Sequence, residues 1–499
     1  MKISAEAVSL SSRSWDLAAC VQFEDDAANA AMMRRLPSGV KSKIAHARAL
    51  GDFAGKKDEA VLVYTENAIP SPRLLIAGAG TSGAYTLEHL RRSAASAVKK
   101  AKACKAVSAA LLLPVHAPQL AAYPAAQIGQ AMAEAAILAL YAYDRHKTKE
   151  TKPNTLRSLS ILLDSDETAR EFRKGIAEGT IIAEAVIRTR DLANAPAIEV
   201  YPASLADAAR RMARETGIRA TVLDRKKIEQ LGMGGVTNVG KGSAHDPRFI
   251  ILDYKPQKSK RTVVLVGKGV TFDSGGISIK PSAGMGEMRA DMHGGASVIG
   301  TLEAAARLKL PVHLVGLVPA VENMPSGTAL KPGDIITHYN GMTTEVDNTD
   351  AEGRLILADA LSYAARYKPD VIIDLATLTG AAVVALGHHA MAMLGTDETA
   401  MADLKKAGDL TYERVWQLPL FEEYNRQIKS DVADVKNVGG RWGGAITAAA
   451  FLKHFVGDHP WVHLDIAGPS FFEEAQDYIP KGATGVGVRL LIEYLRTLH

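Results

Sequence analysis

Cysteine is scarce in this sequence, since only Cys20 and Cys104 occur in 499 residues. Two cysteines cannot build a disulfide framework or supply the ligands of a thiolate metal site. Such scarcity is typical of proteins from a reducing compartment. No apolar segment is long enough to cross a bilayer, and no apolar signal region follows Met1. We therefore expect a cytoplasmic protein that makes no contact with a membrane.

A large charge of either sign is also missing, because the formal net charge is only +4 at pH 7. This value is too small to imply a polyanionic partner. Basic residues do gather locally. The first cluster contains Arg91, Arg92, Lys99, Lys100, Lys102 and Lys105, and the second contains Lys255, Lys258, Lys260 and Arg261. Such clusters are usually solvated faces, but they leave nucleic-acid binding open as an alternative function.

Two common hydrolase motifs do not occur. The sequence has no HExxH, and Pro460 keeps His459 and His463 off a common helix face. We interpret these two, together with His388 and His389, as structural or surface histidines. Ser274 lies in DSGG rather than in a GxSxG elbow, which argues against a serine hydrolase.

Strand-like apolar runs, such as residues 263–266 and 371–375, alternate with helical segments along the chain. The length suggests more than one domain. Acidic residues at 164–167 open a long helical segment that Pro196 terminates. The sequence therefore predicts an α/β protein with two domains, each with a mixed or largely parallel sheet flanked by helices. We expect an N-terminal α/β domain at 1–165, a linking helix at 166–192 and a larger α/β domain at 193–499.

The segment NTDAEGRL, residues 348–355, concentrates two carboxylates, a cation and a helix start. In extended backbone, residues two apart point the same way, so Asp350 and Glu352 are expected to converge. Such a carboxylate pair can bind a cation. Arg354 at the helix start favours an anion beside that site. The alternative is that Asp350 and Arg354 form only an N-cap and a surface pair.

Further charged residues follow the apolar run 263–266. They are Lys268, Asp273, Lys280 and Asp291. Four carboxylates in an apolar neighbourhood would suffer large pKa penalties unless cations neutralise them. Two divalent cations would do so, with Lys268 bound as a neutral amine and Lys280 left charged for a substrate oxygen. The alternative is a set of structural Lys–Asp ion pairs.

These motifs, VGKGVTFDSGG, the segment from Lys280 to Asp291, and NTDAEGRL, resemble the leucyl (cytosol) aminopeptidases, which are two-metal exopeptidases, here of the bacterial type. RDLANAP, VADVKNVGG, WVHLDIAG and KGATGVGVRLL are also similar to the family. The resemblance covers nearly all of the chain from about Arg190 onward. Residues 193–499 would then be the catalytic metallopeptidase domain.

The resemblance implies a role for each motif residue. It implies that the metals are held by Lys268, Asp273, Asp291, Asp350 and Glu352, of which Asp273 and Glu352 bridge. Lys280 and Arg354 would be the catalytic pair. The substrate pocket would include Met288, Asn348, Ala351, Thr377 and Gly380. An anion site at Gly353, Arg354 and Leu355 would bind bicarbonate as general base. The family also implies a homohexamer.

The expected function is hydrolysis of the N-terminal residue of peptides through a hydroxide activated by two metals per subunit. A small, apolar pocket favours neutral N-terminal residues such as Leu or Met. The family resemblance indicates Mn²⁺ or Zn²⁺. A ligand set of oxygens and one amine also leaves Mg²⁺ and Co²⁺ as candidates. The alternative function is nucleic-acid binding on the same scaffold, as the main role or as a second one.

Overall fold

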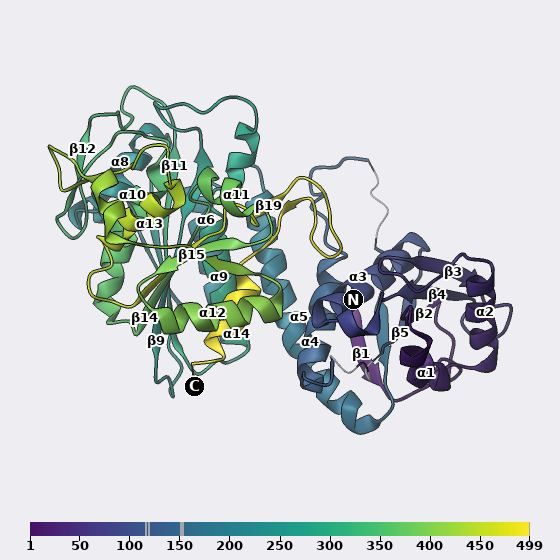
Figure 1. Cartoon of the computed structure of the whole chain (residues 1–499). Helices are drawn as coiled ribbons and strands as arrows, with labels where there is room; N and C mark the ends of the chain where they lie inside the picture. The colour runs from purple at the N-terminus through teal and green to yellow at the C-terminus, as the bar shows by residue number, and fades with distance from the viewer. Residues whose placement is uncertain (115–116, 118–119, 150–153, 499) are drawn as a thin grey trace. The chain divides into compact units, whose positions relative to one another are not determined.

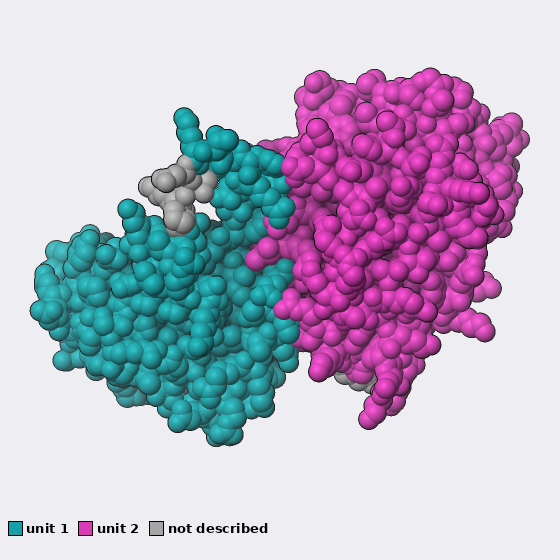
Figure 2. Space-filling model, turned by 180° about the vertical axis from the view of Figure 1, so that it is seen from behind, with its two compact units in different colours: residues 1–184, 475–480 teal, residues 185–474, 481–499 magenta. Residues whose placement is uncertain are grey.

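The computed structural model describes residues 1–114, 117, 120–149 and 154–498. The chain divides into two compact units, coloured separately in Figure 2. Unit 1 contains residues 1–184 and 475–480, and unit 2 contains residues 185–474 and 481–499. Helix α5 (Asp166–Asn194) covers the segment expected to link two domains. None of the helices in the described residues is both long and apolar enough to cross a bilayer.

The described part of unit 1 is built around a six-stranded sheet in the order β1-β6-β5-β2-β4-β3. Its strands are β1 (Lys2–Glu6), β2 (Leu17–Gln22), β3 (Ala60–Tyr64), β4 (Arg73–Gly78), β5 (Ser108–Leu112) and β6 (Ser158–Leu162). Its other helices are α1 (Asp26–Arg35), α2 (Ser38–Ala49), α3 (Leu87–Ala103) and α4 (Ala125–Leu138). All neighbouring strands are parallel except the edge pair β3 and β4, which is antiparallel.

The described part of unit 2 contains a nine-stranded sheet. Eight of its strands follow the order β16-β15-β18-β14-β9-β11-β8-β7, and the ninth, β10, pairs with β11. The strands are β7 (Arg219–Leu223), β8 (Arg248–Tyr254), β9 (Thr262–Gly267), β10 (Gly269–Asp273), β11 (His313–Asn323), β14 (Val371–Ala376), β15 (Met391–Gly395), β16 (Val415–Gln417) and β18 (Trp461–Asp465). Strands β18, β14, β9, β11 and β10 run parallel, whereas β7, β8 and β15 pair antiparallel with a neighbour. The predicted α/β class with mixed, mostly parallel sheets is thus confirmed.

Helices cover both faces of this sheet (Figure 1). The helices of unit 2 are α6 (Pro202–Thr216), α7 (Arg225–Gln230), α8 (Gly234–Val239), α9 (His293–Arg307), α10 (Glu352–Ala364), α11 (Gly380–Leu386), α12 (Glu398–Thr411), α13 (Gly444–Lys453) and α14 (Val488–Leu495). Val264 and Val266 of β9 pack in one core with Leu355 and Phe451 from α10 and α13. Because α9 also contacts β9, this strand is buried from Val263 to Gly267 and its sequence is a continuous apolar run over 263–266.

Two small sheets and several 3₁₀-helices complete the described part of unit 2. Strands β12 (Ile335–Thr337), β13 (Thr343–Glu345) and β17 (Val435–Lys436) form one sheet, and β19 (Phe471–Phe472) pairs with β20 (Gly482–Ala483). The 3₁₀-helix η4 (Met285–Ala290) precedes α9. In the sequence, each of these elements lies in a segment that follows a strand of the main sheet.

Candidate metal centre

Polar side chains follow neighbouring strands of the unit 2 sheet at their carboxyl ends. Lys268 follows β9, Asp273 ends β10 and Asn323 ends β11, while Thr377 follows β14 and Asp465 ends β18. Because these five strands are parallel neighbours, their carboxyl ends meet at one edge of the sheet. The fold therefore brings together residues that are up to about two hundred positions apart in the chain.

Asp273 is buried at this edge, with its carboxylate held from two sides. Its Oδ1 accepts hydrogen bonds from the backbone N–H of Gly275 and from Nδ2 of Asn323, each at 2.8 Å. Its Oδ2 lies 2.8 Å from Nζ of Lys280. The turn that follows needs glycine, because Gly275 has φ +87°. The Asp273 carboxylate is thus fixed in one orientation.

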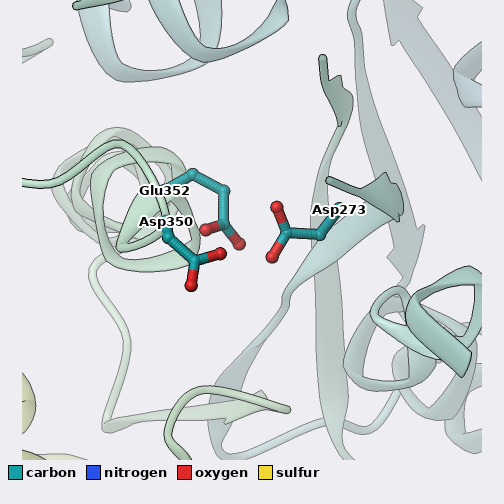
Figure 3. A group of neighbouring side chains, drawn as sticks. All are labelled: Asp273, Asp350 and Glu352. Carbon is teal, nitrogen blue, oxygen red and sulfur yellow. The ribbon is translucent and has the colours of Figure 1, made fainter. Parts of the chain in front are cut away.

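Asp350 and Glu352 approach Asp273 from the start of α10 (Figure 3). One carboxylate oxygen of each of the three residues lies within 4.8 Å of the other two. The predicted convergence of Asp350 and Glu352 is confirmed, but the predicted extended backbone is wrong. Ala351 has φ −111° and ψ 43° and is the N-cap of α10, so the loop turns into the helix between the two acids. The spacing of three carboxylates could hold a divalent cation.

Asp350 is not the side-chain cap of α10, because the N-cap Ala351 makes no side-chain cap hydrogen bond. Instead, Asp350 forms an ion pair with Lys280, and its backbone N–H donates to Oδ1 of Asn348 at 2.8 Å. The alternative of an N-cap and surface pair between Asp350 and Arg354 is therefore contradicted.

Lys268 is buried between two further carboxylates. Its Nζ lies 2.7 Å from Oδ2 of Asp291 and 2.9 Å from Oε1 of Glu352, and it donates to the carbonyl oxygen of Thr377 at 3.0 Å. The Lys268 side chain passes directly against Gly353. A Cβ at position 353 would lie 2.6 Å from its Cε, so only glycine leaves room for this lysine.

Burial and mutual repulsion shift Asp291, Asp350 and Glu352 toward their neutral forms. Burial, with Asp273 adding to it, raises the pKa of Glu352 to about 8. Burial also raises the pKa of Asp291 to about 6 against the opposing effect of Lys268, and it raises the pKa of Asp350. Burial alone would lower the pKa of Lys268, but Asp291 and Glu352 outweigh it and hold that pKa above its usual range.

The carboxylates of this cluster carry more negative charge than the two lysines can neutralise, so the cluster is suited to divalent cations. Both lysines do form ion pairs, as the alternative interpretation expected, yet four carboxylates of this cluster face only two ammonium groups. In the described residues, Oδ2 of Asp291 and Oε1 of Glu352 are buried and accept no hydrogen bond of proper geometry, although Lys268 is close to both. Buried oxygens in this state are suited to a metal ion.

Arg354 lies beside this cluster in the first turn of α10 and is 7% exposed. Its Nη1 donates to the carbonyl oxygen of Asn437 at 2.6 Å, while its Nε has no hydrogen-bond partner among the described residues. Burial lowers the pKa of Arg354 to about 10, with Glu352 and Asp465 opposing the shift. The guanidinium thus remains charged at neutral pH and keeps one donor available.

A cleft of about 560 Å³ opens over the cluster. Lys268, Asp273, Lys280, Asp291 and Asp350 line its floor, together with Met288, Thr377 and Gly380 of the predicted substrate pocket. Asn348 and Ala351, also predicted for the pocket, are not among the residues that line the cleft. The wall additionally contains Glu287 and Glu473, which the prediction did not include.

Three residues that hold the site were missed in the sequence. Asn323 binds Asp273 and also donates to the carbonyl oxygen of Thr349 at 3.0 Å. Asn437 donates to the carbonyl oxygen of Asn348 at 2.7 Å, and Asp465 accepts from Oγ1 of Thr379 at 2.7 Å. Asn437 and Asp465 lie in the motifs VADVKNVGG and WVHLDIAG, so a signal was present. For Asn323, the only signal in the sequence was its position after an apolar run.

Of the histidines set aside in the sequence, His388 lines the cleft but is not part of the acidic cluster. His463 is buried, with Nδ1 2.6 Å from Oδ1 of Asp374, and His388 contacts the carbonyl oxygen of Gly468. The first basic cluster is also partly neutralised, because Arg91 is buried against Glu88 and Arg92 pairs with Glu88 and Asp477. This cluster is therefore not the fully solvated basic face that the sequence suggested.

The chain matches one known family over most of its length. Residues 187–492 match the catalytic domain of the cytosol aminopeptidase family, and residues 20–150 match the N-terminal domain of that family. A "Probable cytosol aminopeptidase" of Geobacter sp. (strain M21) is 49% identical over 447 residues, which is 89% of this chain and 90% of that protein. One from Geobacter sulfurreducens is 44% identical over 95% of each chain.

Solved structures agree with this match. The bottromycin maturation enzyme BotP in complex with Mn has a TM-score of 0.85 and 37% identity, covering 97% of this chain and 99% of that chain. A tomato leucine aminopeptidase mutant has a TM-score of 0.89 and 34% identity, covering 100% of this chain and 96% of that chain. None of these descriptions concerns nucleic acid, so the alternative function gains no support. The acidic cluster, the family match and the structural neighbours together show that this chain belongs to the cytosol aminopeptidase family and is a metal-dependent exopeptidase.

Proposed function

We propose that this enzyme removes neutral N-terminal residues from peptides, using two divalent cations per subunit. The observation that carries the proposal is the convergence of one carboxylate oxygen each from Asp273, Asp350 and Glu352 within 4.8 Å, with Asp273 and Asp350 lining the cleft. The metal ligands would be Lys268, Asp273, Asp291, Asp350 and Glu352, with Asp273 and Glu352 shared by both cations. The buried oxygens Oδ2 of Asp291 and Oε1 of Glu352, which lie close to the Lys268 ammonium, support this assignment.

When bound, the cations would supply Lewis acidity toward the scissile carbonyl and lower the pKa of a water molecule. The protein's own residues would do the rest. Lys280 faces the cleft between Asp273 and Asp350, where its ammonium can stabilise an oxyanion that develops on the substrate. Lys268 would bind as a neutral amine, because nearby dications oppose its ammonium form. Thr377 and Asn323 would keep Asp291 and Asp273 oriented.

The general base would be bicarbonate held by Arg354 and by the backbone N–H groups of Gly353 and Leu355 in the first turn of α10. A buried guanidinium with a donor to spare, at a helix N-terminus, supports binding of a small planar anion. The four carboxylates of the cluster are all assigned as metal ligands, so a separate proton acceptor is required. Arg354 would orient that acceptor and would not bind the peptide itself.

Substrate preference would follow from the small and apolar residues Met288, Thr377 and Gly380 in the cleft. Such a wall accommodates Leu or Met and discriminates among aliphatic residues only modestly. We further propose Mn²⁺ or Zn²⁺ as the metals, with Mg²⁺ or Co²⁺ competing at the looser site. The BotP structure contains Mn, which supports this choice of metal. The relatives are named cytosol aminopeptidases, which supports a cytoplasmic enzyme. A homohexamer is part of the same proposal.

The test is metal removal and restoration, assayed on a panel of amino-acid amides. Dialysis against a chelator should abolish hydrolysis of leucinamide, and Mn²⁺ or Zn²⁺ should restore it with two equivalents bound per subunit. Full activity in protein shown by elemental analysis to contain no metal would overturn the proposal. Faster hydrolysis of N-terminal Asp or Glu than of Leu would overturn the proposed preference. Sedimentation that shows a monomer at assay concentration would exclude the homohexamer.

A further inference from the structure

Two segments from different parts of the chain line the cleft beside the acidic cluster. The first segment contains residues 377–380 and 383, which run from the end of β14 into α11. The second contains residues 467, 470, 471 and 473, which follow β18. We call them the 377–383 wall and the 467–473 wall. Strands β14 and β18 are parallel neighbours, so both walls start at the same edge of the sheet. The width of the cleft therefore depends on how these two walls are held together.

Asp465, at the end of β18, joins the two walls and is only 1% exposed. Its Oδ1 accepts hydrogen bonds from the backbone N–H of Leu378 in one wall and of Ala467 in the other, each at 3.1 Å. Its Oδ2 accepts from Oγ1 of Thr379 at 2.7 Å. Thr379 is the N-cap of α11, and its Oγ1 accepts in turn from the backbone N–H of Ala382 at 3.0 Å. One buried carboxylate thus fixes the start of α11 against the segment that follows β18.

A carboxylate is well suited to this position. Hydrogen bonds to an ionised acceptor are stronger than those between neutral groups, and without Asp465 two backbone N–H groups and one hydroxyl would lose their acceptor. The walls meet again at the end of α11, where Nδ1 of His388 lies 2.7 Å from the carbonyl oxygen of Gly468. That contact is only partly buried, so water can replace it more easily than it can replace Asp465.

We propose that Asp465 is a positioning residue that sets the width of the pocket for the side chain of the residue that is removed. The inference rests on the proposed function and deepens it, because it concerns the same neutral side chains in the same cleft. Asp465 does not line the cleft, so it acts through the walls and does not touch the substrate. With the carboxylate in place, the walls keep a spacing that suits Leu or Met. Without it they separate, so that Leu loses contacts and a larger side chain such as that of Phe gains room.

The kinetic experiment compares leucinamide, alaninamide and phenylalaninamide as substrates of the metal-loaded enzyme. In Asp465→Ala, the ratio of kcat/KM for leucinamide over alaninamide should fall roughly tenfold, as for the loss of about one methylene contact. The ratio for phenylalaninamide over leucinamide should rise, and KM for leucinamide should change more than kcat. Thr379→Val should act in the same direction but less, because Leu378 and Ala467 keep their acceptor.

Matched variants separate positioning from a general effect on the fold. Thr379→Ser keeps the hydroxyl that Asp465 accepts from, so it should keep substrate ratios close to the native ones. Thr301→Val removes another buried hydroxyl of unit 2, which donates to the carbonyl oxygen of Ser297 within α9, and should leave the ratios unchanged. If Asp465→Ala and Thr379→Val slow all three amides by one factor, with constant ratios, the proposal is overturned. Asp465 would then act only on the fold or on the neighbouring Arg354.

Hydrogen exchange separates this proposal from the proposed function, because it needs no turnover. Asp465→Ala should speed exchange in both walls relative to β9, which reports the stability of the whole unit. Thr379→Val should speed it in the 377–383 wall alone. Unchanged protection of the 467–473 wall in Asp465→Ala overturns the proposal, and so does faster exchange with unchanged substrate ratios. If both walls respond as expected but the native enzyme hydrolyses none of the amides, the proposed function alone fails.

Discussion

The two units share an architecture but differ in the surroundings of their charged side chains. In unit 1, Glu6 at the end of β1 contacts Ser4, Ser160 and Arg13, and these hydrogen bonds lower its pKa despite the opposing effect of burial. In unit 2, burial beside other acids raises the pKa of Glu352 to about 8. A glutamate that is satisfied by hydroxyls and a guanidinium stabilises a fold. One left among like charges is suited to bind a cation.

The arginines show the same contrast. Arg35 of unit 1 donates to the carbonyl oxygens of Leu113 and Leu162, and its Nε pairs with Asp164. Arg354 of unit 2 donates to Asn437 but keeps an Nε without a partner among the described residues. In the described residues, the acidic group with metal-ligand spacing also lies in unit 2. The carboxylates at metal-ligand spacing, and not the α/β fold itself, therefore mark the functional unit.

The largest expected effect is the loss of activity when Glu352 is changed, compared with the same change at Glu6. Glu352→Gln preserves shape but removes a charge, so we expect bound metal to fall below two equivalents. The value of kcat/KM should fall at least a hundredfold, because even residues that only support metal ligands cost about 10- to 100-fold when changed. Glu6→Gln should leave both quantities unchanged. Elemental analysis and amide hydrolysis on both variants check the contrast, which fails if the two glutamines behave alike.

The second effect concerns the arginines. Arg354→Ala should lower kcat by roughly a hundredfold, as expected for loss of a general base, with metal content and KM nearly retained. Removing carbonate from the buffer should slow the native enzyme and hardly change this variant. Arg35→Ala should reduce stability and leave kcat and the bicarbonate response intact. Equal bicarbonate responses of Arg354→Ala and the native enzyme would mean that Arg354 does not anchor the anion.

A third effect tests close packing behind the site. Gly353→Ala should displace Lys268 and cost about 1–3 kcal/mol of stability, together with a loss of activity. Gly327→Ala is the control in unit 2, because its Cβ would meet nothing within 4 Å. In unit 1, Gly175→Ala would press against the carbonyl of Ala126, so it should lower the melting temperature without lowering kcat. Calorimetry and kinetics on the three variants distinguish these outcomes.

The smallest effect is a pH dependence in unit 1. The folded-state pKa of Glu6 is lowered, so its contribution to stability is present above the unfolded value of about 4.5 and is lost as the pH falls through the folded value. Glu6→Gln should therefore lower stability slightly at pH 7, by less than about 1 kcal/mol, and have no effect at the acidic end. Urea unfolding at a series of pH values measures this, and an equal effect at every pH would contradict it.

Much of the site could be read from local sequence. Runs such as residues 263–266 predict buried strands, and acids that cannot neutralise one another predict cations. Strand direction could not be read in the same way, because a buried run has the same pattern in parallel and antiparallel pairs. Thus β8 reads like β9, yet it runs antiparallel to β11. Likewise, residues 475–480 belong to unit 1 although they lie near the C-terminus.

The sequence by itself determined the α/β class, the acids and lysines of the site, and the family to which the chain belongs, because each depends on residue types at short spacing. Only the tertiary structure decided that Asn323 orients Asp273, that Asn437 contacts Arg354, and that Glu287 and Glu473 share one cleft. These relations join segments that are fifty or more residues apart. They follow from the return of separate strands to one edge of the sheet, which no local pattern encodes.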